Sequence, residues 1–183
     1  MQLLLAFSPF LAFLVGERHL GLVPALCLGA LVAAALVVRE RLRGARETRV
    51  LEVGTALLFG ALAACAASVP GIAWSVGLVR LVLDLGLMLL VLAGIALGKP
   101  FTLAFARAQV APERATSPQF LRTASLVAAA WAGAFGVLAV ADGVWIVEPA
   151  WPLAVPVAIG AAGVLGALAL TRWLPQRARR RGA

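Results

Sequence analysis

Residues 72–97 read IAWSVGLVRLVLDLGLMLLVLAGIAL, and this stretch decides the fold class. It contains two charged side chains, Arg80 and Asp84, and is otherwise apolar or small. As a helix, the stretch is about 39 Å long, which exceeds the roughly 30 Å of hydrocarbon in a bilayer. Because a lipid-facing backbone must satisfy its own hydrogen bonds, the stretch predicts a transmembrane α-helix.

The composition of the whole chain agrees with a membrane location. Of 183 residues, 63% are hydrophobic and 13% are charged, and the mean hydropathy is +1.01. A soluble domain of this size leaves about a third of its unfolded-chain surface exposed, and so few charges do not cover that surface. The composition therefore excludes a water-soluble domain, a disordered chain and a nucleic-acid-binding domain.

Four further apolar stretches have the length of a membrane span, namely 20–38, 50–69, 123–147 and 151–171. The segment 2–15 is apolar but would be only about 21 Å long as a helix. It has no basic residue and no small-residue cleavage site after it, so we do not expect a cleaved signal peptide. We expect instead a short, tilted or re-entrant helix, broken by Pro9 and closing as a hairpin at 16–21.

These stretches predict an all-α, polytopic transmembrane bundle of five to six spans in one domain, 1–173, followed by a basic tail, 174–183. Basic residues flanking spans stay on the cytoplasmic side. Fourteen of the sixteen Lys and Arg residues lie in the connectors 39–49 and 99–122 and in 172–181. The C-terminus is therefore predicted to be cytoplasmic.

The basic tail and the amino-acid usage predict the setting of the protein. Four arginines near the C-terminus would attract anionic lipid headgroups at about 1 kcal/mol each, namely Arg177, Arg179, Arg180 and Arg181. They are predicted to be a lipid anchor rather than a nucleic-acid site. The strong preference for Arg over Lys is typical of a GC-rich bacterial genome, so we expect a multi-pass protein of the bacterial inner membrane.

Arg80 and Asp84 form the principal candidate site, because ionisable residues inside a span are costly. Their spacing of four places both on one helix face, about 6 Å apart along the axis. The pair is either a proton or ion relay or a structural ion pair that fixes helix packing. Glu52 is a possible coupling carboxylate or a first-turn acid at a helix N-terminus. Asp142 is expected at the outer end of its span, where water solvates it.

The single histidine and the two cysteines lack the neighbouring residues that a metal site or a catalytic site requires. His19 has no companion ligands for a metal. Cys27 and Cys65 lie in apolar spans and are expected to act as small hydrophobes. The chain has no nucleophile elbow, zinc-protease motif, P-loop or dinucleotide fingerprint. We therefore expect a non-enzymatic protein with no metal and no cofactor.

Small residues and the longest connector are candidate contact surfaces. Small residues recur every fourth position, as in Gly21-Ala25-Gly29-Ala33, in Ala158-Ala162-Gly166 and in Gly94-x-x-x-Gly98. These faces serve either packing within the chain or contact with a second copy or another membrane protein. In the connector 99–122, four apolar residues recur at helical spacing, namely Phe101, Ala104, Phe105 and Ala108. They predict a short helix that lies at the lipid headgroups. This helix is either an interfacial spacer or part of a binding loop.

The order of elements also carries a family resemblance. A long span ends in Gly98-Lys99-Pro100-Phe101-Thr102, the connector runs to Phe120, and an aromatic helix follows with Trp131-Ala132. This plan resembles the bacterial intracellular septation protein A family. One Lys rather than two precedes Pro100, and Ala124 stands where that family has Asn, so a sister family of small polytopic membrane proteins is the alternative.

The resemblance implies a non-enzymatic inner-membrane protein that acts in cell envelope maintenance or septation through protein partners, with Gly98, Lys99 and Pro100 as a cytoplasmic motif. The alternative hypothesis comes from the charged span. It is a small proton- or ion-coupled transporter that uses Arg80 and Asp84.

Overall fold

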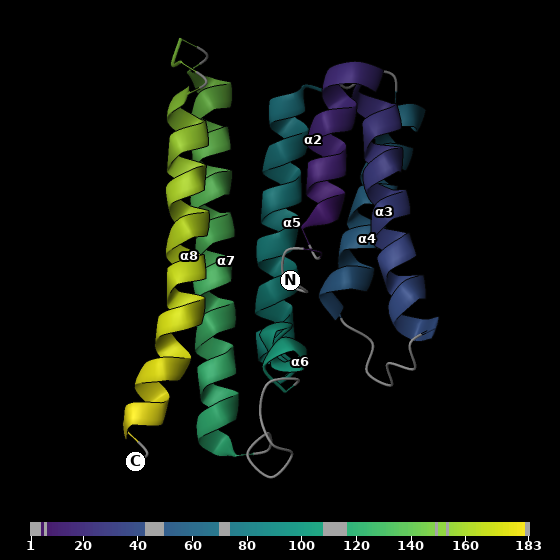
Figure 1. Ribbon diagram of the computed structural model, residues 1–183. Helices are drawn as coiled ribbons and strands as arrows, with labels where there is room; N and C mark the ends of the chain where they lie inside the picture. The colour runs from purple at the N-terminus through teal and green to yellow at the C-terminus, as the bar shows by residue number, and fades with distance from the viewer. Residues whose placement is uncertain are drawn as a thin grey trace. The chain divides into compact units, whose positions relative to one another are not determined.

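The computed structural model describes residues 5, 7–42, 50–69, 74–107, 117–148, 150–152 and 154–181. Every regular element within these ranges is a helix (Figure 1). The helices are α2 (Ser8–Leu20), α3 (Leu22–Leu42), α4 (Val50–Ser68), α5 (Val76–Ala96), α6 (Thr102–Arg107), α7 (Pro118–Val147) and α8 (Ala154–Arg181). Five of them, α3, α4, α5, α7 and α8, are long and apolar enough to cross a membrane. The predicted all-α bundle is confirmed.

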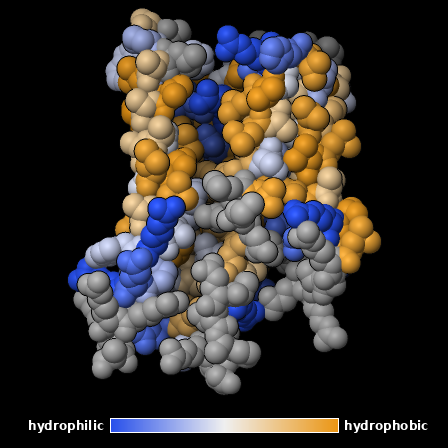
Figure 2. Space-filling model, in the orientation of Figure 1, coloured by the Kyte–Doolittle hydropathy of each residue, from blue (hydrophilic) through white to orange (hydrophobic). Residues whose placement is uncertain are grey.

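The long helices expose large apolar side chains that a soluble protein would bury. Leu31, Leu57 and Leu165 are each about two-thirds exposed. Hydrophobic atoms cover long stretches of the helices in Figure 2, while hydrophilic atoms gather mainly toward the helix ends. Apolar surface of this extent requires a nonpolar covering, which lipid tails supply. The chain is an integral membrane protein.

The helices fall into two compact units, Met1–Val79 and Arg80–Ala183. In the first unit, α2 packs on α3 and α3 packs on α4. The predicted hairpin between the short first helix and the next is present, but it is tighter than expected. Its hinge is Gly21, whose φ of +85° favours glycine.

Pro9 lies next to the interruption predicted within the first apolar segment: Leu5 is helical, Phe7 lies in a turn, and α2 begins at Ser8. Pro9 lies in the first turn of α2 and so begins the helix, because proline has no amide hydrogen to contribute and its fixed φ suits that turn. The helix then continues to Leu20. Glu17 and His19 therefore lie on the helix and not in a connector.

The core of the first unit is built around Phe59 of α4, which is fully buried. Its ring centroid lies 5.2 Å from that of Phe10 and 5.9 Å from that of Phe13. A Cβ atom at Gly29 of α3 would lie 2.7 Å from the Phe59 ring. The small-residue stripe around Gly29 therefore packs within the chain.

In the second unit, α7 and α8 form a long hairpin. Helix α7 begins with a side-chain cap: the Phe120 amide donates to Ser117 Oγ over 3.3 Å, and Pro118 occupies the first turn. A Cβ atom at Gly160 of α8 would collide with Leu138 of α7. Glycine at this position therefore lets the two helices approach closely.

A buried polar contact joins the same two helices. The Trp131 Nε1–H donates to Thr171 Oγ1 over 3.0 Å, and the Thr171 hydroxyl donates to the Ala167 carbonyl over 2.8 Å. Trp131 is 1% exposed, so its indole needs this partner within the bundle.

The predicted helix in the long connector is present as α6, and it packs against α7. The Thr102 hydroxyl donates to the Ala124 carbonyl of α7 over 2.7 Å. Phe101, Thr102 and Leu103 are buried, so the inward side of this segment differs from the predicted apolar face. Ala108, the last residue of that predicted face, lies outside the described residues.

The basic tail was predicted as a separate segment, but its backbone continues α8 as helix to Arg181, with Pro175 inside the helix. The Arg177 guanidinium carbon lies 4.7 Å from the centroid of the Trp173 ring, a cation–π contact one turn away. The side chains of Arg179, Arg180 and Arg181 lie outside the described part of the structure, as do residues 43–49 of the first basic connector.

Candidate intramembrane charge site

Three charged side chains of the second unit meet between α5 and α7. The Arg80 guanidinium Nη2 of α5 lies 3.3 Å from Asp142 Oδ1 of α7. Asp84 lies one helical turn after Arg80 on the same face of α5, and its carboxyl group interacts electrostatically with that of Asp142. We call Arg80, Asp84 and Asp142 the charge site.

Helix geometry explains how the charge site is assembled. Arg80 lies about 6 Å along α5 from its first residue, and Asp142 lies about 7.5 Å before the last residue of α7. The chain runs along α5, reverses direction after α6 and runs back along α7. The start of α5 and the end of α7 therefore lie toward the same end of the second unit (Figure 1). Asp84 follows Arg80 by one helical turn on the same face.

Glycines on α7 leave room for side chains of α5. A Cβ atom at Gly143 would lie 4.0 Å from Leu81 Cδ1, and one at Gly136 would lie 3.3 Å from Met88 Sδ. Both glycines lie on α7 near the level of the α5 side chains that they contact. Small residues on α7 therefore leave room for the side chains of α5 near the level at which Arg80 reaches Asp142.

Asp142 is almost completely buried, with 2% of its surface exposed, whereas the Arg80 side chain is 24% exposed. The expectation that water solvates Asp142 was therefore wrong. The physical reason lies in the helix period: Ala128, Trp131, Phe135 and Ala139 form the buried face of α7, and Asp142 continues it three residues further on. That spacing is visible in the sequence and is the signal that identifies Asp142.

The charge site holds more acid than base. Arg80 uses Asp142 Oδ1, while Asp142 Oδ2 has no hydrogen-bond partner among the described residues. With all three groups ionised, two carboxylates face one guanidinium, so one negative charge is uncompensated. An uncompensated charge inside a span costs about 3 kcal/mol or more, so the charge site favours a positive occupant.

The sequence-predicted pair is thus part of a larger cluster. Arg80 and Asp84 share a face of α5 as their spacing predicted, but the residue in direct ion-pair contact with Arg80 is Asp142. Sequence spacing within one helix identified two of the three members. The third comes from another helix, 58 residues from Asp84 in the chain.

The predicted cytoplasmic motif has a structural role at the end of α5. Gly98 has a φ of +67°, its amide donates to the Ile95 carbonyl over 3.0 Å, and the Lys99 amide donates to the Gly94 carbonyl over 2.8 Å. These two bonds define a Schellman C-cap, and Pro100 follows it as such caps favour. The spacing Gly94-x-x-x-Gly98 therefore reflects helix termination.

The other candidate residues belong to helices of the first unit. Glu52 lies in the first turn of α4, a position that favours an acid. Cys27 and Cys65 are free and lie on exposed positions of α3 and α4.

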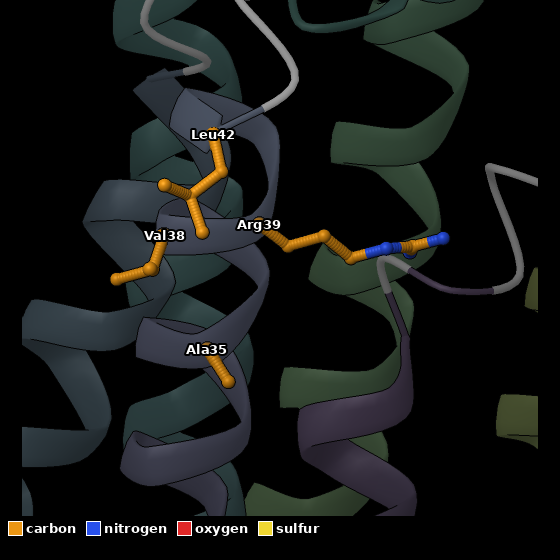
Figure 3. Close-up of a pocket in the computed structure, with 4 residues that line it drawn as sticks. All are labelled: Ala35, Val38, Arg39 and Leu42. Atoms are coloured by element: carbon orange, nitrogen blue, oxygen red, sulfur yellow. The ribbon is translucent and has the colours of Figure 1, made fainter.

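A shallow groove on α3 is lined by Ala35, Val38, Arg39 and Leu42 (Figure 3). All four residues belong to one helix, and Arg39 is the only charged residue among them. The groove therefore brings together no set of groups that could carry a reaction.

Comparison with models of protein families, with curated proteins and with solved structures finds no significant match. The fold and the charge site define a multi-pass integral membrane protein with a charged cluster inside its spans. The resemblance to the septation protein A family stays a prediction from the sequence.

Proposed function

We propose that the protein is a small ion-coupled transporter and that the charge site is its coupling site. The observation that carries this proposal is the second carboxyl group. An Arg80–Asp142 pair alone would be neutral and would suffice to fix helix packing. Asp84 adds an acid that this pair does not need, and the net negative charge suits a cation that binds and leaves.

The packing of α5 supports the same function. α7 packs along α8 with close backbone approach, whereas α5 meets α7 mainly through side chains. An element held by few contacts opens at lower free-energy cost than a closely packed one. Movement of α5 against the α7–α8 hairpin would change the access of ions to Asp84 and Asp142.

The test is charge movement by purified protein in proteoliposomes adsorbed to a solid-supported electrode. Rapid changes of proton or sodium concentration should produce a current that Asp84→Asn abolishes. Glu148→Gln is the matched control, because Glu148 is exposed beyond the end of α7. Protein-containing vesicles that give no more current than empty vesicles, for either ion, would refute the transport function.

A second candidate function is the one that the sequence resemblance implies: an envelope or septation component that acts through membrane partners. In its favour, Ala158, Ala162 and Gly166 lie on the exposed side of α8, where another helix has room to approach closely. Crosslinking in native membranes from a cysteine at position 162 should then recover a protein of the division or envelope machinery. Recovery of lipid adducts alone would exclude this candidate.

The proposed location is the bacterial inner membrane with a cytoplasmic C-terminus and an arginine-rich lipid anchor. A reporter fused after residue 183 that is active only in the cytoplasm should be active. A reporter that requires export should be inactive at the same position, and the reverse pattern would contradict the orientation.

A further inference from the structure

We propose that Asp84 and Asp142 form a proton-binding site in which one proton is shared between the two carboxyl groups, with Arg80 as the fixed countercharge. This inference rests on the transport function proposed above, because it names the ion that the coupling site takes. It is argued from hydrogen bonding, from charge and from the coordination that other cations need.

The hydrogen bonds of Asp142 leave a place for one proton. The Arg80 guanidinium forms an ion pair with Oδ1, and Oδ2 is buried without a hydrogen-bond partner among the described residues. The titratable side chain that interacts with Asp142 besides Arg80 is that of Asp84, which is itself a carboxyl group, one turn after Arg80 on the same face of α5. A carboxylate only accepts hydrogen bonds, whereas a protonated carboxyl also donates one. A proton on either group therefore supplies the missing donor.

The charge balance of the three side chains also indicates one bound proton. Two carboxylates and one guanidinium sum to one negative charge, and one bound proton makes the site neutral. A second proton would leave Arg80 uncompensated inside the span. A single shared proton is therefore the occupancy that both hydrogen bonding and charge favour.

A metal cation fits the site less well. Calcium takes about six or more oxygen ligands, and magnesium requires near-octahedral coordination. Within the described residues, no group of three or more acidic, His or Cys side chains is placed to hold a metal ion. Arg80 also occupies Asp142 Oδ1 and would repel a metal at the same carboxylates. A proton needs no coordination shell.

Among the described residues of the neighbouring helices, the other charged groups lie far from Asp142 along their helices, and Glu148 is exposed beyond the end of α7. In α5, the charged residues are Arg80 and Asp84. In α7, Arg122 lies twenty residues before Asp142, about 30 Å along the axis. The apolar part of α8 has no titratable residue before Arg172, and α6 carries only Arg107, near the opposite end of α7.

The proton step is a simple transfer between oxygen atoms. In the loaded state, the O–H of Asp84 donates to Asp142 Oδ2. On release, that O–H bond breaks, its electron pair stays on the Asp84 oxygen, and the proton passes to a water molecule to form hydronium. Loading is the reverse. Arg80 positions Asp142 in both states and transfers no proton.

The sequence offers an unusually specific test, because Asp84 and Asp142 are the two aspartates of the chain. Protein made by cell-free synthesis with aspartate isotope-labelled in its side-chain carboxyl carries the label only in the charge site. Infrared difference spectroscopy in lipid nanodiscs should show a protonated-carboxyl C=O band that shifts with this label and with D2O. Raising the pH should remove the band with loss of one proton per chain.

Variants separate a shared proton from a proton held by one isolated carboxyl. Asp84→Asn and Asp142→Asn should each abolish the band, because the remaining carboxylate then pairs with Arg80 as an ion. Glu148→Gln should leave the band unchanged. Persistence of the band in Asp142→Asn would overturn sharing. If an Asn variant fails to fold, absence of a label-sensitive band in the unmodified protein overturns the proposal by itself.

The outcome is distinguishable from failure of the transport function. A label-sensitive band without any ion-driven current would leave the proton site in place and refute transport. A sodium-driven current from protein that shows no such band would support transport and refute the proton site.

Discussion

At the scale of single residues, the ion pair between Arg80 and Asp142 lowers the free-energy cost of placing these two charged side chains inside the membrane. Asp142 is buried, and its Oδ1 lies 3.3 Å from the guanidinium. Ion pairs in a low-dielectric medium barely offset the cost of desolvation, but removing one partner is strongly unfavourable. The groups of the charge site therefore depend on one another.

The first prediction concerns the loss of both carboxylates. Asp84→Asn combined with Asp142→Asn leaves Arg80 without a countercharge. Removal of one side of a buried pair costs about 3–5 kcal/mol, and the partial exposure of Arg80 lowers the expected loss of unfolding free energy to about 2–3 kcal/mol. Equilibrium unfolding in mixed detergent micelles measures this loss of unfolding free energy. Asp142→Asn alone should cost less, because Asp84 remains as a partner.

The control for this prediction removes the cation as well. Adding Arg80→Gln to the double variant should recover at least half of the lost stability, because no charge then remains in the span. A triple variant that is no more stable than the double variant would show that Arg80 is not held by these carboxylates.

The sequence identified Arg80 and Asp84 because both interrupt a long apolar run. Asp142 was misplaced because it lies near the end of its span, five residues before Val147, where solvation is the usual explanation. Its position on the buried face of α7 could be read from the helix period. Its pairing with Arg80 could not, since local spacing does not determine which helices are neighbours.

At the scale of helices, close packing in the first unit depends on Gly29. Gly29→Ala would place a Cβ atom 2.7 Å from the ring of Phe59, which is fully buried between Phe10 and Phe13 and has no free direction in which to move. We expect a loss of about 1–3 kcal/mol in unfolding free energy, as for other overpacked cores.

Gly60 provides the matched control for Gly29, since it lies on α4 beside Phe59 and a Cβ atom there meets nothing within 4 Å. Gly60→Ala should be neutral or stabilising through helix propensity. Equal effects of the two substitutions would contradict the packing of Gly29 against Phe59.

Removing one hydrogen bond between α7 and α8 should lower the unfolding free energy by less than overpacking at Gly29. Thr171→Val keeps the shape of the side chain but removes the acceptor of the Trp131 indole hydrogen. Hydrogen bonds between membrane helices contribute about 0.6–1.7 kcal/mol, so we expect a loss within that range. Thr123→Val is the control, because the Thr123 hydroxyl bonds only to the Gln119 carbonyl of its own helix among the contacts described. A loss no larger than that of the control would argue against the interhelical bond.

Helix number and type were predictable because apolar length alone sets them in a membrane protein. The ends were predicted less well where proline was involved. Pro9 lies in the first turn of α2, directly after the turn at Phe7, whereas Pro175 lies inside α8, beyond the apolar stretch that was expected to span the membrane. A proline fixes its own φ, but whether the chain continues beyond it depends on neighbouring packing.

At the scale of the whole molecule, the exposed apolar side chains of the spans predict how the protein fractionates. Such surface is stable only against lipid or detergent. After an alkaline carbonate wash, which removes peripheral proteins, the protein should stay in the membrane pellet and should enter solution only with detergent. Release by the wash alone would contradict the assignment as an integral membrane protein.

The division into two compact units was not foreseen from the sequence. Hydropathy marks each span but does not rank the contacts among spans, because every span has similar apolar surface. Small residues determine which spans pack closely together. Gly29 allows close packing of α3 on α4, and Gly160 allows it for α7 and α8.

The most direct measurement of the central claim is oxidative crosslinking of α5 to α7 in intact membranes. Leu81→Cys with Gly143→Cys, in a Cys27→Ala and Cys65→Ala background, places two thiols next to the charge site, because a Cβ atom at position 143 would lie 4.0 Å from Leu81 Cδ1. Leu83→Cys with Gly143→Cys is the control, because position 83 lies on the other side of α5. We expect rapid disulfide formation in the first pair and little in the second. Equal rates, or no crosslink in the first pair, would contradict it.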